Sequence, residues 1–571
     1  MQDRDWVSKI YKDKSNRGWF HLGILMVWVI LGWALRFANL GAKSPSSIEI
    51  ATLGYSLGHS FFDIPLDQVI TLKQLLLPLQ FEAATNPGDV INYLMSESTH
   101  PPLYFLLTHF WLKFFSHEGE LVSLAAGRSL SAIFGVIAIP GMFGLGCLAF
   151  RSLIVGQIAA ALMAFSPYGV YLAQEARHYT LTIVWIIAAL SCFVAAIRCI
   201  QRHIPYPIWL GCFWVIVNSL GMASHYFFSL VLLAQGLVIA IFWLRDLDKA
   251  SQNYWWRIYA VGAGTLVGCL VWFPALQGIS GNEITDWIAT SFELDEVWHP
   301  LPRLLVWAIT MVLLLPVEGV SSPVQIIFAG IMLLALLWLI PILRSGWKHQ
   351  ISSSALTSLS LQAIRGYLLA TFLIFLFLIY VVGKDLSLAA RYHFVYFPAL
   401  IVLFAAIFAA HWHNYLVPVV KGKKVVIIIL ILGFCGALTV VNNYGYQKSQ
   451  RSDLLASLIQ HNSTAPVLIA SSYETHSEIR ALMGLGFVFQ NLKPKSNFTE
   501  TQFLLLKKKS DRSVTQDSTL GKILTQIPRP MELWGVNLKV DSNDIDDFNC
   551  LEDTDLRTKV SGYRYRLYHC R

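Results

Sequence analysis

The stretch SPYGVYLAQEARHYTL, residues 166–181, joins two long apolar segments and brings several polar side chains together. Gln174, Glu175, Arg177, His178 and Tyr179 arrive within six positions at the mouth of a predicted membrane helix. Charged groups at membrane depth are costly unless they face a partner or a cavity, so they are candidates for function. The alternative is that this stretch is only the polar end of a helix, with Arg177 extending toward the lipid headgroups.

The composition predicts a polytopic α-helical membrane protein. Of the 571 residues, 55% are hydrophobic and 14% are charged, and the mean hydropathy is +0.54. A single water-soluble globule of this size does not have such a composition. The net charge of +8 is spread over short loops and a polar tail. We therefore interpret the charge as a sign of membrane topology and expect membrane lipids, and no nucleic acid, as partners.

Residues 1–18 carry five basic side chains and precede an apolar run, 19–40, that is long enough to cross the hydrocarbon core. This pattern predicts a cytoplasmic N-terminal segment followed by an anchor. Two later runs, 102–116 and 302–318, are expected to lie along the interface, because the basic loops then fall inside. The prediction is a transmembrane domain over 19–445, with residues 41–121 as the first outer loop. Its eleven spans include the following further apolar runs: 122–149, 153–173, 180–200, 207–224, 226–244, 257–277, 323–343, 365–382, 392–411 and 424–441.

The composition changes after residue 445, where Lys, Asp, Ser and Thr become common and no run is long enough to span. Short apolar segments read as strands, with one amphipathic helix between them. Residues 446–571 are therefore predicted to form a small soluble α/β domain on the outer side. Cys550 and Cys570 both lie in it, and an oxidising outer compartment would permit them to pair.

Three other features are predicted on the same outer side. Glu49 is the first acidic residue after the first span, His100 is followed by two prolines, and Arg391 with Tyr392 opens a late span. Each has a simpler structural explanation: a solvated loop carboxylate, a helix start fixed by proline, and interface anchors.

Together these features resemble the GT-C glycosyltransferases, in the branch that includes the protein O-mannosyltransferases and the lipid A aminoarabinose transferase (ArnT-like enzymes). The resemblance covers residues 19–440. It implies a polyprenyl-phosphate-linked sugar as donor, entering from the lipid, and an acceptor held in an outer cavity. Guanidinium groups suit a departing phosphate. The resemblance implies this set of substrate-binding residues: His100, Arg177, His178, Tyr179, Arg391 and Tyr392.

One departure from the family concerns the catalytic base. The branch generally carries an Asp-Glu pair in the first outer loop, and the corresponding pair here is Ile48-Glu49. The candidate catalytic residues are therefore Glu49 and Glu175, with Glu49 replacing the missing aspartate and Glu175 orienting Arg177 or lining the acceptor site. Other possibilities are that Asp63 or Asp286 substitutes, or that the protein does not catalyse.

No metal and no cofactor are expected, because the only spaced acids, Glu293 and Asp295 with Glu296, offer too few oxygen ligands for a hard cation. The acceptor is left open among protein, lipid and polysaccharide. The location expected is the plasma (inner) membrane, multi-pass, with the C-terminal domain extracytoplasmic.

Two rival functions keep part of this interpretation. A non-catalytic GT-C relative would bind a polyprenyl-phosphate lipid or support a partner, and Ile48 is the evidence for it. A membrane transporter would show internal repeats, or broken helices with ionisable groups at mid-membrane. The sequence favours an enzyme over a transporter, because its charges gather at the outer ends of the spans.

Overall fold

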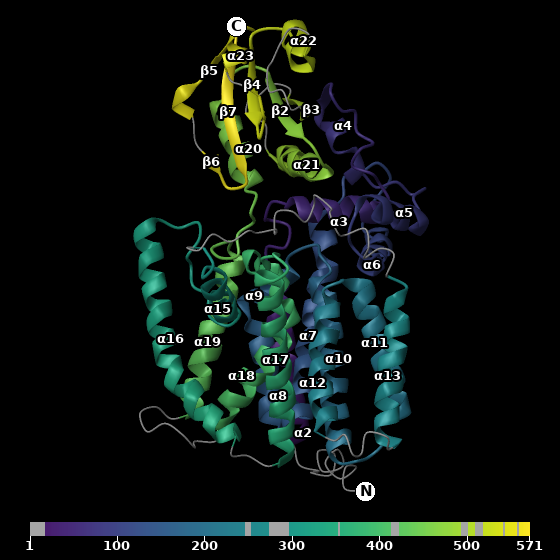
Figure 1. The fold of residues 1–571 in the computed structure, drawn as a ribbon. Coiled ribbons are helices and arrows are strands. Elements are labelled where there is room, and N and C mark those ends of the chain that lie inside the picture. The colour runs from purple at the N-terminus through teal and green to yellow at the C-terminus, as the bar shows by residue number, and fades with distance from the viewer. Residues whose placement is uncertain are drawn as a thin grey trace. The chain divides into compact units, whose positions relative to one another are not determined.

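A computed structural model describes residues 17–245, 253–272, 296–351, 355–412, 422–492, 501–508, 518–540, 543–556 and 559–571 (Figure 1). The chain forms two compact units. Unit 1 comprises residues 1–40, 99–104 and 128–447, and unit 2 comprises residues 41–98, 105–127 and 448–571. Unit 2 thus combines segments that the sequence analysis assigned to two domains. Each unit is described by itself.

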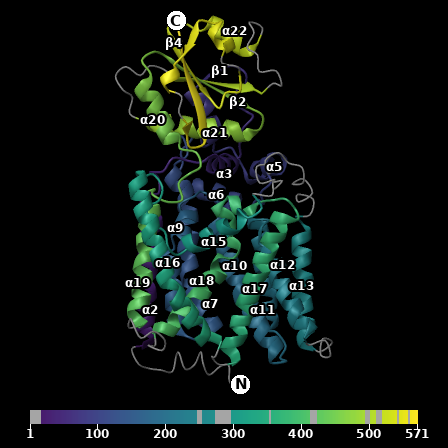
Figure 2. The same ribbon diagram turned by 60° about the vertical axis from the view of Figure 1, so that its left-hand side comes forward.

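Unit 1 is a bundle of long helices that run alongside one another in Figures 1 and 2. Packed pairs include α2 with α8, α8 with α18, α10 with α11, and α12 with α17. A continuous apolar cluster of buried side chains fills the space between them. The helices are α2 (Arg17–Phe37), α7 (Leu124–Phe150), α8 (Leu153–Phe165), α9 (Pro167–Ala173), α10 (Tyr179–Gln201), α11 (Ile208–Ser224), α12 (Phe228–Leu244), α13 (Asn253–Leu270), α15 (Pro300–Thr310), α16 (Ser322–Ile351), α17 (Ala355–Tyr380), α18 (Phe397–Trp412) and α19 (Gly422–Val441).

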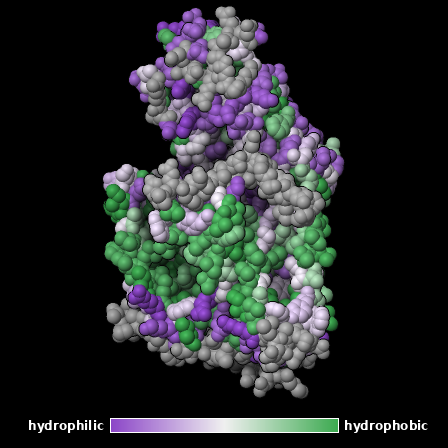
Figure 3. All heavy atoms as spheres, viewed as in Figure 1, coloured by the Kyte–Doolittle hydropathy of each residue, from purple (hydrophilic) through white to green (hydrophobic). Residues whose placement is uncertain are grey.

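Six described helices are long and apolar enough to cross a membrane, and there are seven if the bent pair α8–α9 forms one span. The helices α11, α12 and α18 are apolar but shorter. Large apolar side chains remain exposed on α16, where Ile326 is 72% and Leu334 is 67% accessible. Figure 3 shows such hydrophobic residues covering the helices on the face in view. The protein is therefore a multi-pass membrane protein, as the composition predicts.

The two runs predicted to lie along the interface form short helices. α6 (Leu103–Leu112) has 10 residues and α15 has 11. At 1.5 Å per residue each is about 15 Å long, roughly half of the hydrocarbon core. Neither helix can cross a membrane alone.

A break between α8 and α9 begins the stretch that decides the fold. The two helices meet at an angle of 56°. Pro167 has no N–H to continue the hydrogen bonding of α8, and Ser166 before it is extended. The Ser166 hydroxyl caps the new helix by accepting from the Gly169 N–H at 3.0 Å, and it donates to the Met311 carbonyl at 2.7 Å. The break therefore redirects the chain toward the loop that carries Arg177.

Unit 2 is built on a seven-stranded mixed sheet with the order β1-β3-β2-β4-β7-β5, in which β6 pairs with β7. β2, β3, β4 and β7 lie within residues 446–571, where the sequence predicts strands. β1 comes from the first outer loop and pairs antiparallel with β3, so that Val69 lies opposite Leu504. The strands are β1 (Val69–Thr71), β2 (Val467–Tyr473), β3 (Thr501–Lys507), β4 (Met531–Val536), β5 (Cys550–Glu552), β6 (Lys559–Val560) and β7 (Tyr563–Cys570).

Helices cover this sheet and extend its core. α21 packs against β2, and also against α3 of the first outer loop. A disulfide joins Cys550 on β5 to Cys570 on β7, which settles the pairing that the sequence left open. The helices of unit 2 are α3 (Ser47–Leu57), α4 (Leu72–Leu75), α5 (Pro87–Glu97), most of α6, α20 (Ser452–Asn462), α21 (His476–Asn491), α22 (Thr519–Gln526) and α23 (Asn543–Asp546).

Candidate functional site

Four loops of unit 1 bring polar side chains together. They are the turn before α6, the α9–α10 loop, the α11–α12 loop, and the 3₁₀ helix η5 (Ala390–Val395) before α18. The polar and aromatic residues that meet there are called the loop cluster below: His100, Arg177, His178, Tyr179, His225, Arg391 and Tyr392.

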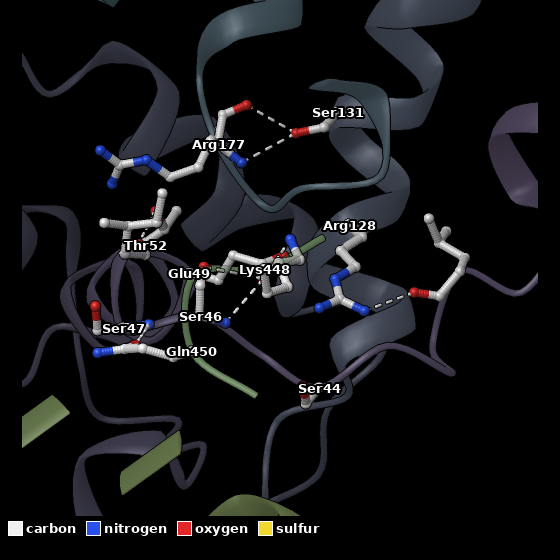
Figure 4. A network of polar contacts seen from close by, with 12 residues as sticks. Ser44, Ser46, Ser47, Glu49, Thr52, Arg128, Ser131, Arg177, Lys448 and Gln450 are labelled. Carbon is white, nitrogen blue, oxygen red and sulfur yellow. Dashed lines mark hydrogen bonds and ion pairs between the residues drawn. The ribbon is translucent and has the colours of Figure 1, made fainter. Parts of the chain in front are cut away.

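Arg177 is held at both its backbone and its side chain. Its N–H donates to Ser131 Oγ at 3.2 Å, and Ser131 Oγ donates to its carbonyl at 2.8 Å (Figure 4). The Ser131 hydroxyl has one proton, which it donates to the Arg177 carbonyl. Tyr104 must therefore be the donor in the 2.6 Å contact between the Tyr104 hydroxyl and Ser131 Oγ. The Arg177 guanidinium lies 2.6 Å from His100 Nε2 through Nη2, and it lies over the Tyr179 ring at 5.8 Å. Arg177 is therefore a fixed, buried cation.

Three histidine rings lie in a row that begins at Arg177. The His100 and His178 ring centroids are 5.3 Å apart, and those of His178 and His225 are 4.4 Å apart. Burial lowers the pKa of His225 to about 3, with repulsion from Arg177 and Arg391 as the further cause. Burial, then His225, Arg177 and His100, hold the pKa of His178 well below its usual value. Both rings are thus neutral at physiological pH and able to donate or accept hydrogen bonds.

Arg391 approaches the same place from η5. Its guanidinium lies 5.2 Å from the Tyr392 ring centroid, and that ring packs against Phe227 at 5.1 Å. The positive charge of Arg391 acts at His225, where it is one cause of the lowered pKa. The six residues predicted to bind substrate therefore gather in the loops of one unit.

Reciprocal capping fixes the loop that carries Arg177. The buried Arg36 guanidinium on α2 donates to the carbonyls of Met163 at 2.8 Å and Ala164 at 3.1 Å, which lie in the last turn of α8. Gln174, at the end of α9, donates in turn to the carbonyls of Leu35 at 3.2 Å and Ala38 at 2.8 Å, at the end of α2. Each side chain satisfies carbonyls that a helix end leaves without partners. The two caps tie α2 to the loop.

The sequence analysis did not identify Arg36 or His225 as candidate functional residues. Arg36 lies in an apolar run and reads there as an end-of-span anchor. Its close fit against α7 needs a glycine, because a Cβ on Gly135 would lie 2.9 Å from Arg36 Nε. His225 stands in the short gap between two apolar runs. A lone histidine between two consecutive spans was the sequence signal that could have identified His225 as a candidate.

Glu49 belongs to unit 2 and lies in a different kind of environment. It is fully buried at the third position of α3, where its carboxylate accepts from the Ser46 N–H at 3.1 Å and closes a capping box. The same oxygen lies 3.0 Å from Lys448 Nζ (Figure 4). Glu49 is thus already engaged in a helix cap and an ion pair.

The other acids raised by the sequence are less informative. Glu175 is buried in the same loop as Arg177. Asp63 is exposed in unit 2. Asp286, Glu293 and Asp295 lie outside the described residues. Within the described ranges, no three His, Cys, Asp or Glu side chains gather as a group that could hold a metal ion.

Comparison with solved structures finds chains similar to this one. ArnT from Cupriavidus metallidurans bound to undecaprenyl phosphate aligns with a TM-score of 0.50 at 12% identity, over 98% of this chain and 99% of that one. The apo form of that ArnT aligns with a TM-score of 0.49 at 10% identity, over 98% of this chain and 99% of that one. The Archaeoglobus fulgidus oligosaccharyltransferase complexed with Zn and sulfate aligns with a TM-score of 0.45 at 12% identity, over 90% of this chain and 67% of that one. Neither a protein-family model nor a curated protein matches the sequence. The chain has the ArnT-like GT-C fold, which confirms the resemblance.

Proposed function

We propose that this protein is an integral-membrane glycosyltransferase that moves a sugar from a polyprenyl-phosphate donor to an acceptor on the outer side of the membrane. The observation that carries the proposal is the loop cluster, where the charges of Arg177 and Arg391 both act on the neutral His225 and Arg177 contacts His100. Support comes from the fold, which this chain shares with an ArnT solved with undecaprenyl phosphate. The phosphodiester of an entering donor, which carries one negative charge, meets two guanidinium groups beside the neutral His225.

The chemistry needs a leaving group and a base. The acceptor oxygen attacks the anomeric carbon, the bond from that carbon to the phosphate oxygen breaks, and polyprenyl phosphate leaves with the electron pair. Arg177 and Arg391 stabilise the charge that develops on the phosphate. His100 and Tyr392 hold the two guanidinium groups in place.

The acceptor proton goes to a carboxylate in this proposal. We assign that role to Glu175 first, because it lies in the Arg177 loop of unit 1. Glu49 is the alternative, and its lone pairs already serve Ser46 and Lys448. A base must be within hydrogen-bond reach of the proton that it removes. Replacing either glutamate by glutamine therefore separates the two assignments.

A second candidate function keeps the lipid site and drops the transfer. Ile48 stands where the family generally has its aspartate, and Glu49 beside it is ion-paired. These two facts favour a relative that binds polyprenyl phosphate and does not catalyse.

The proposal includes a topology. Residues 19–445 would supply eleven spans in the plasma (inner) membrane, with the N-terminus cytoplasmic and residues 446–571 extracytoplasmic. The positive-inside distribution of Lys and Arg is the support. The reaction would use neither a metal nor a cofactor, and the acceptor would be a protein, a lipid or a polysaccharide. Reporter fusions after residues 245, 351 and 445 test the sidedness, and activity of a cytoplasmic-only reporter after 445 would overturn it.

The deciding experiment measures transfer of radiolabelled sugar from a panel of polyprenyl-phosphate donors in membranes that contain the protein. The variants are Arg177→Ala, Glu175→Gln and Glu49→Gln, with Arg344→Ala as control, because Arg344 is an exposed arginine of unit 1 outside the cluster. We expect Arg177→Ala and Glu175→Gln to lose transfer by at least about 100-fold. If the wild type binds polyprenyl phosphate and transfers from no donor, the non-catalytic function replaces the enzyme.

A further inference from the structure

A hollow lies in unit 2, and none of the loop-cluster residues lines it. Its volume is about 920 Å³, and its lining comes from the C-terminal ends of β2 and β4, the hairpin β6–β7 and the start of α21. In the sheet, β2 lies between β3 and β4. The strand that follows β2 in the chain, β3, lies on one side of this pair, and the strands that follow β4 lie on the other side, as β7 and β5. In open α/β sheets, ligands bind outside the carboxyl ends of strands where the connections diverge in this way. The hollow therefore has the position of a ligand site.

The lining is strongly basic. Four of its side chains are cationic and one is acidic: Lys539, Lys559, Arg564 and Arg566, with Glu478. The Glu478 carboxylate is engaged in the capping box of α21, where it accepts from the Thr475 N–H at 3.1 Å and the Thr475 hydroxyl at 2.8 Å. Arg566 lies 3.7 Å from Glu552. The remaining cations give the hollow a positive potential.

The hairpin β6–β7 adds an independent observation. Lys559 and Arg564 are directly opposite each other across its two strands, and both side chains are exposed. Like charges at such a position destabilise a strand pair. Among the described residues, no ion pair links either side chain to a carboxylate. An anion between the two cations would remove this repulsion.

We propose that this basic hollow binds a ligand that carries a phosphate or diphosphate group. Arginine and lysine together suit a multiply charged phosphate, the former by its fork of donors and the latter as a point charge. The hollow has the size of a small-molecule site. Tyr563, Tyr565 and Tyr568 also line it and offer flat surfaces to the uncharged part of the ligand. This site is separate from the loop cluster and does not depend on the proposed transfer reaction.

Inorganic pyrophosphate is the probe for the test, titrated by calorimetry into the full-length protein in nanodiscs of zwitterionic lipid. We expect saturable binding, weakened at least about tenfold in the double variant Lys539→Gln/Arg564→Gln. The matched control is Lys507→Gln/Lys522→Gln, which removes two exposed lysines of unit 2 that do not line the hollow. The control should bind within twofold of the wild type.

Two results would overturn the proposal: no saturable binding by the wild type, or equal weakening in both double variants, which would mean general attraction to a basic surface. A second arm identifies the source of the phosphate. If anionic lipid in the nanodiscs competes with pyrophosphate, the ligand is a lipid headgroup. If it does not compete, the ligand is soluble, and binding by the wild type still supports the site. Sugar transfer is not measured in either arm, so failure here leaves the proposed function untouched.

Discussion

Glu49 in unit 2 and Arg177 in unit 1 are both buried charged side chains, yet their environments differ. Glu49 faces the ammonium of Lys448 at 3.0 Å and the backbone N–H of Ser46, so its charge is balanced inside the unit. Arg177 faces His100, and its charge and that of Arg391 both act on His225. An ion pair closed within a helix cap stabilises a fold, whereas two guanidinium groups that act on one loop cluster suit an anionic ligand. The comparison predicts a stability role for Glu49 and a binding role for the cluster.

The largest expected effect breaks the balanced pair. Lys448→Met leaves the Glu49 carboxylate buried without its cation, which costs roughly 3–5 kcal/mol of stability. Hydrogen exchange in β2 and β4, followed by mass spectrometry, should report this loss, because α21 links the helix that carries Glu49 to the sheet.

Two variants make this prediction specific. The double variant Glu49→Gln/Lys448→Met removes both charges and should recover most of the protection. Lys522→Met removes an exposed lysine of the same unit and should change little. Unchanged exchange in Lys448→Met would mean that the ion pair contributes nothing, and the comparison would fail.

The next effect tests the cluster. Arg391→Ala should weaken binding of undecaprenyl phosphate by at least about 30-fold, since truncating one partner of a buried charge pair costs about 2–5 kcal/mol. Arg391→Lys keeps the charge and loses the planar fork, so it should fall between Arg391→Ala and the wild type. Fluorescence competition in detergent measures the affinity, with Arg344→Ala as control. Equal affinity for Arg391→Ala and the wild type would remove Arg391 from the site.

A smaller effect concerns pH. The pKa of His225 is lowered to about 3, whereas an unfolded histidine titrates near 6.5. Below about pH 6.5 the unfolded chain therefore takes up a proton that the folded protein does not, and stability falls as the pH falls toward 3. The loss is about 1.4 kcal/mol per pH unit once the unfolded histidine is fully titrating.

The variant His225→Gln should remove this contribution. Thermal unfolding between pH 5 and 7.5 should then show a shallower loss of stability at the acidic end than in the wild type. Other buried histidines, such as His476 in unit 2, are common to both proteins and cancel in the difference. Parallel curves for the two proteins would show that His225 is protonated in the folded state.

The sequence predicted the parts of this protein that depend on local pattern. The apolar runs correspond to the helices. The loop residues from His100 to Tyr392 gather because short loops between packed helices must stay close to the helix ends that they join. For Glu49, the spacing from Ser46 to Glu49 is also a capping-box signal, and the structure contains that capping box. Its partner Lys448 lies about 400 positions away, and no local pattern identifies such a pair. The pairing of β1 with β3 is likewise non-local.

The smallest effect we predict concerns positioning. Gln174 touches no proposed substrate atom, but its amide donates to the last carbonyls of α2 and so holds the Arg177 loop. Gln174→Leu should weaken undecaprenyl phosphate binding by about fivefold, the equivalent of roughly 1 kcal/mol for a lost hydrogen bond. It should also speed amide exchange in residues 174–178. Gln235→Leu is the matched control, because Gln235 is a buried glutamine of the same unit that lies on α12, outside the loop cluster. Since a structural loss alone would raise exchange throughout unit 1, exchange confined to the loop together with weaker binding distinguishes positioning from general destabilisation. Faster exchange everywhere would assign Gln174 to the fold instead.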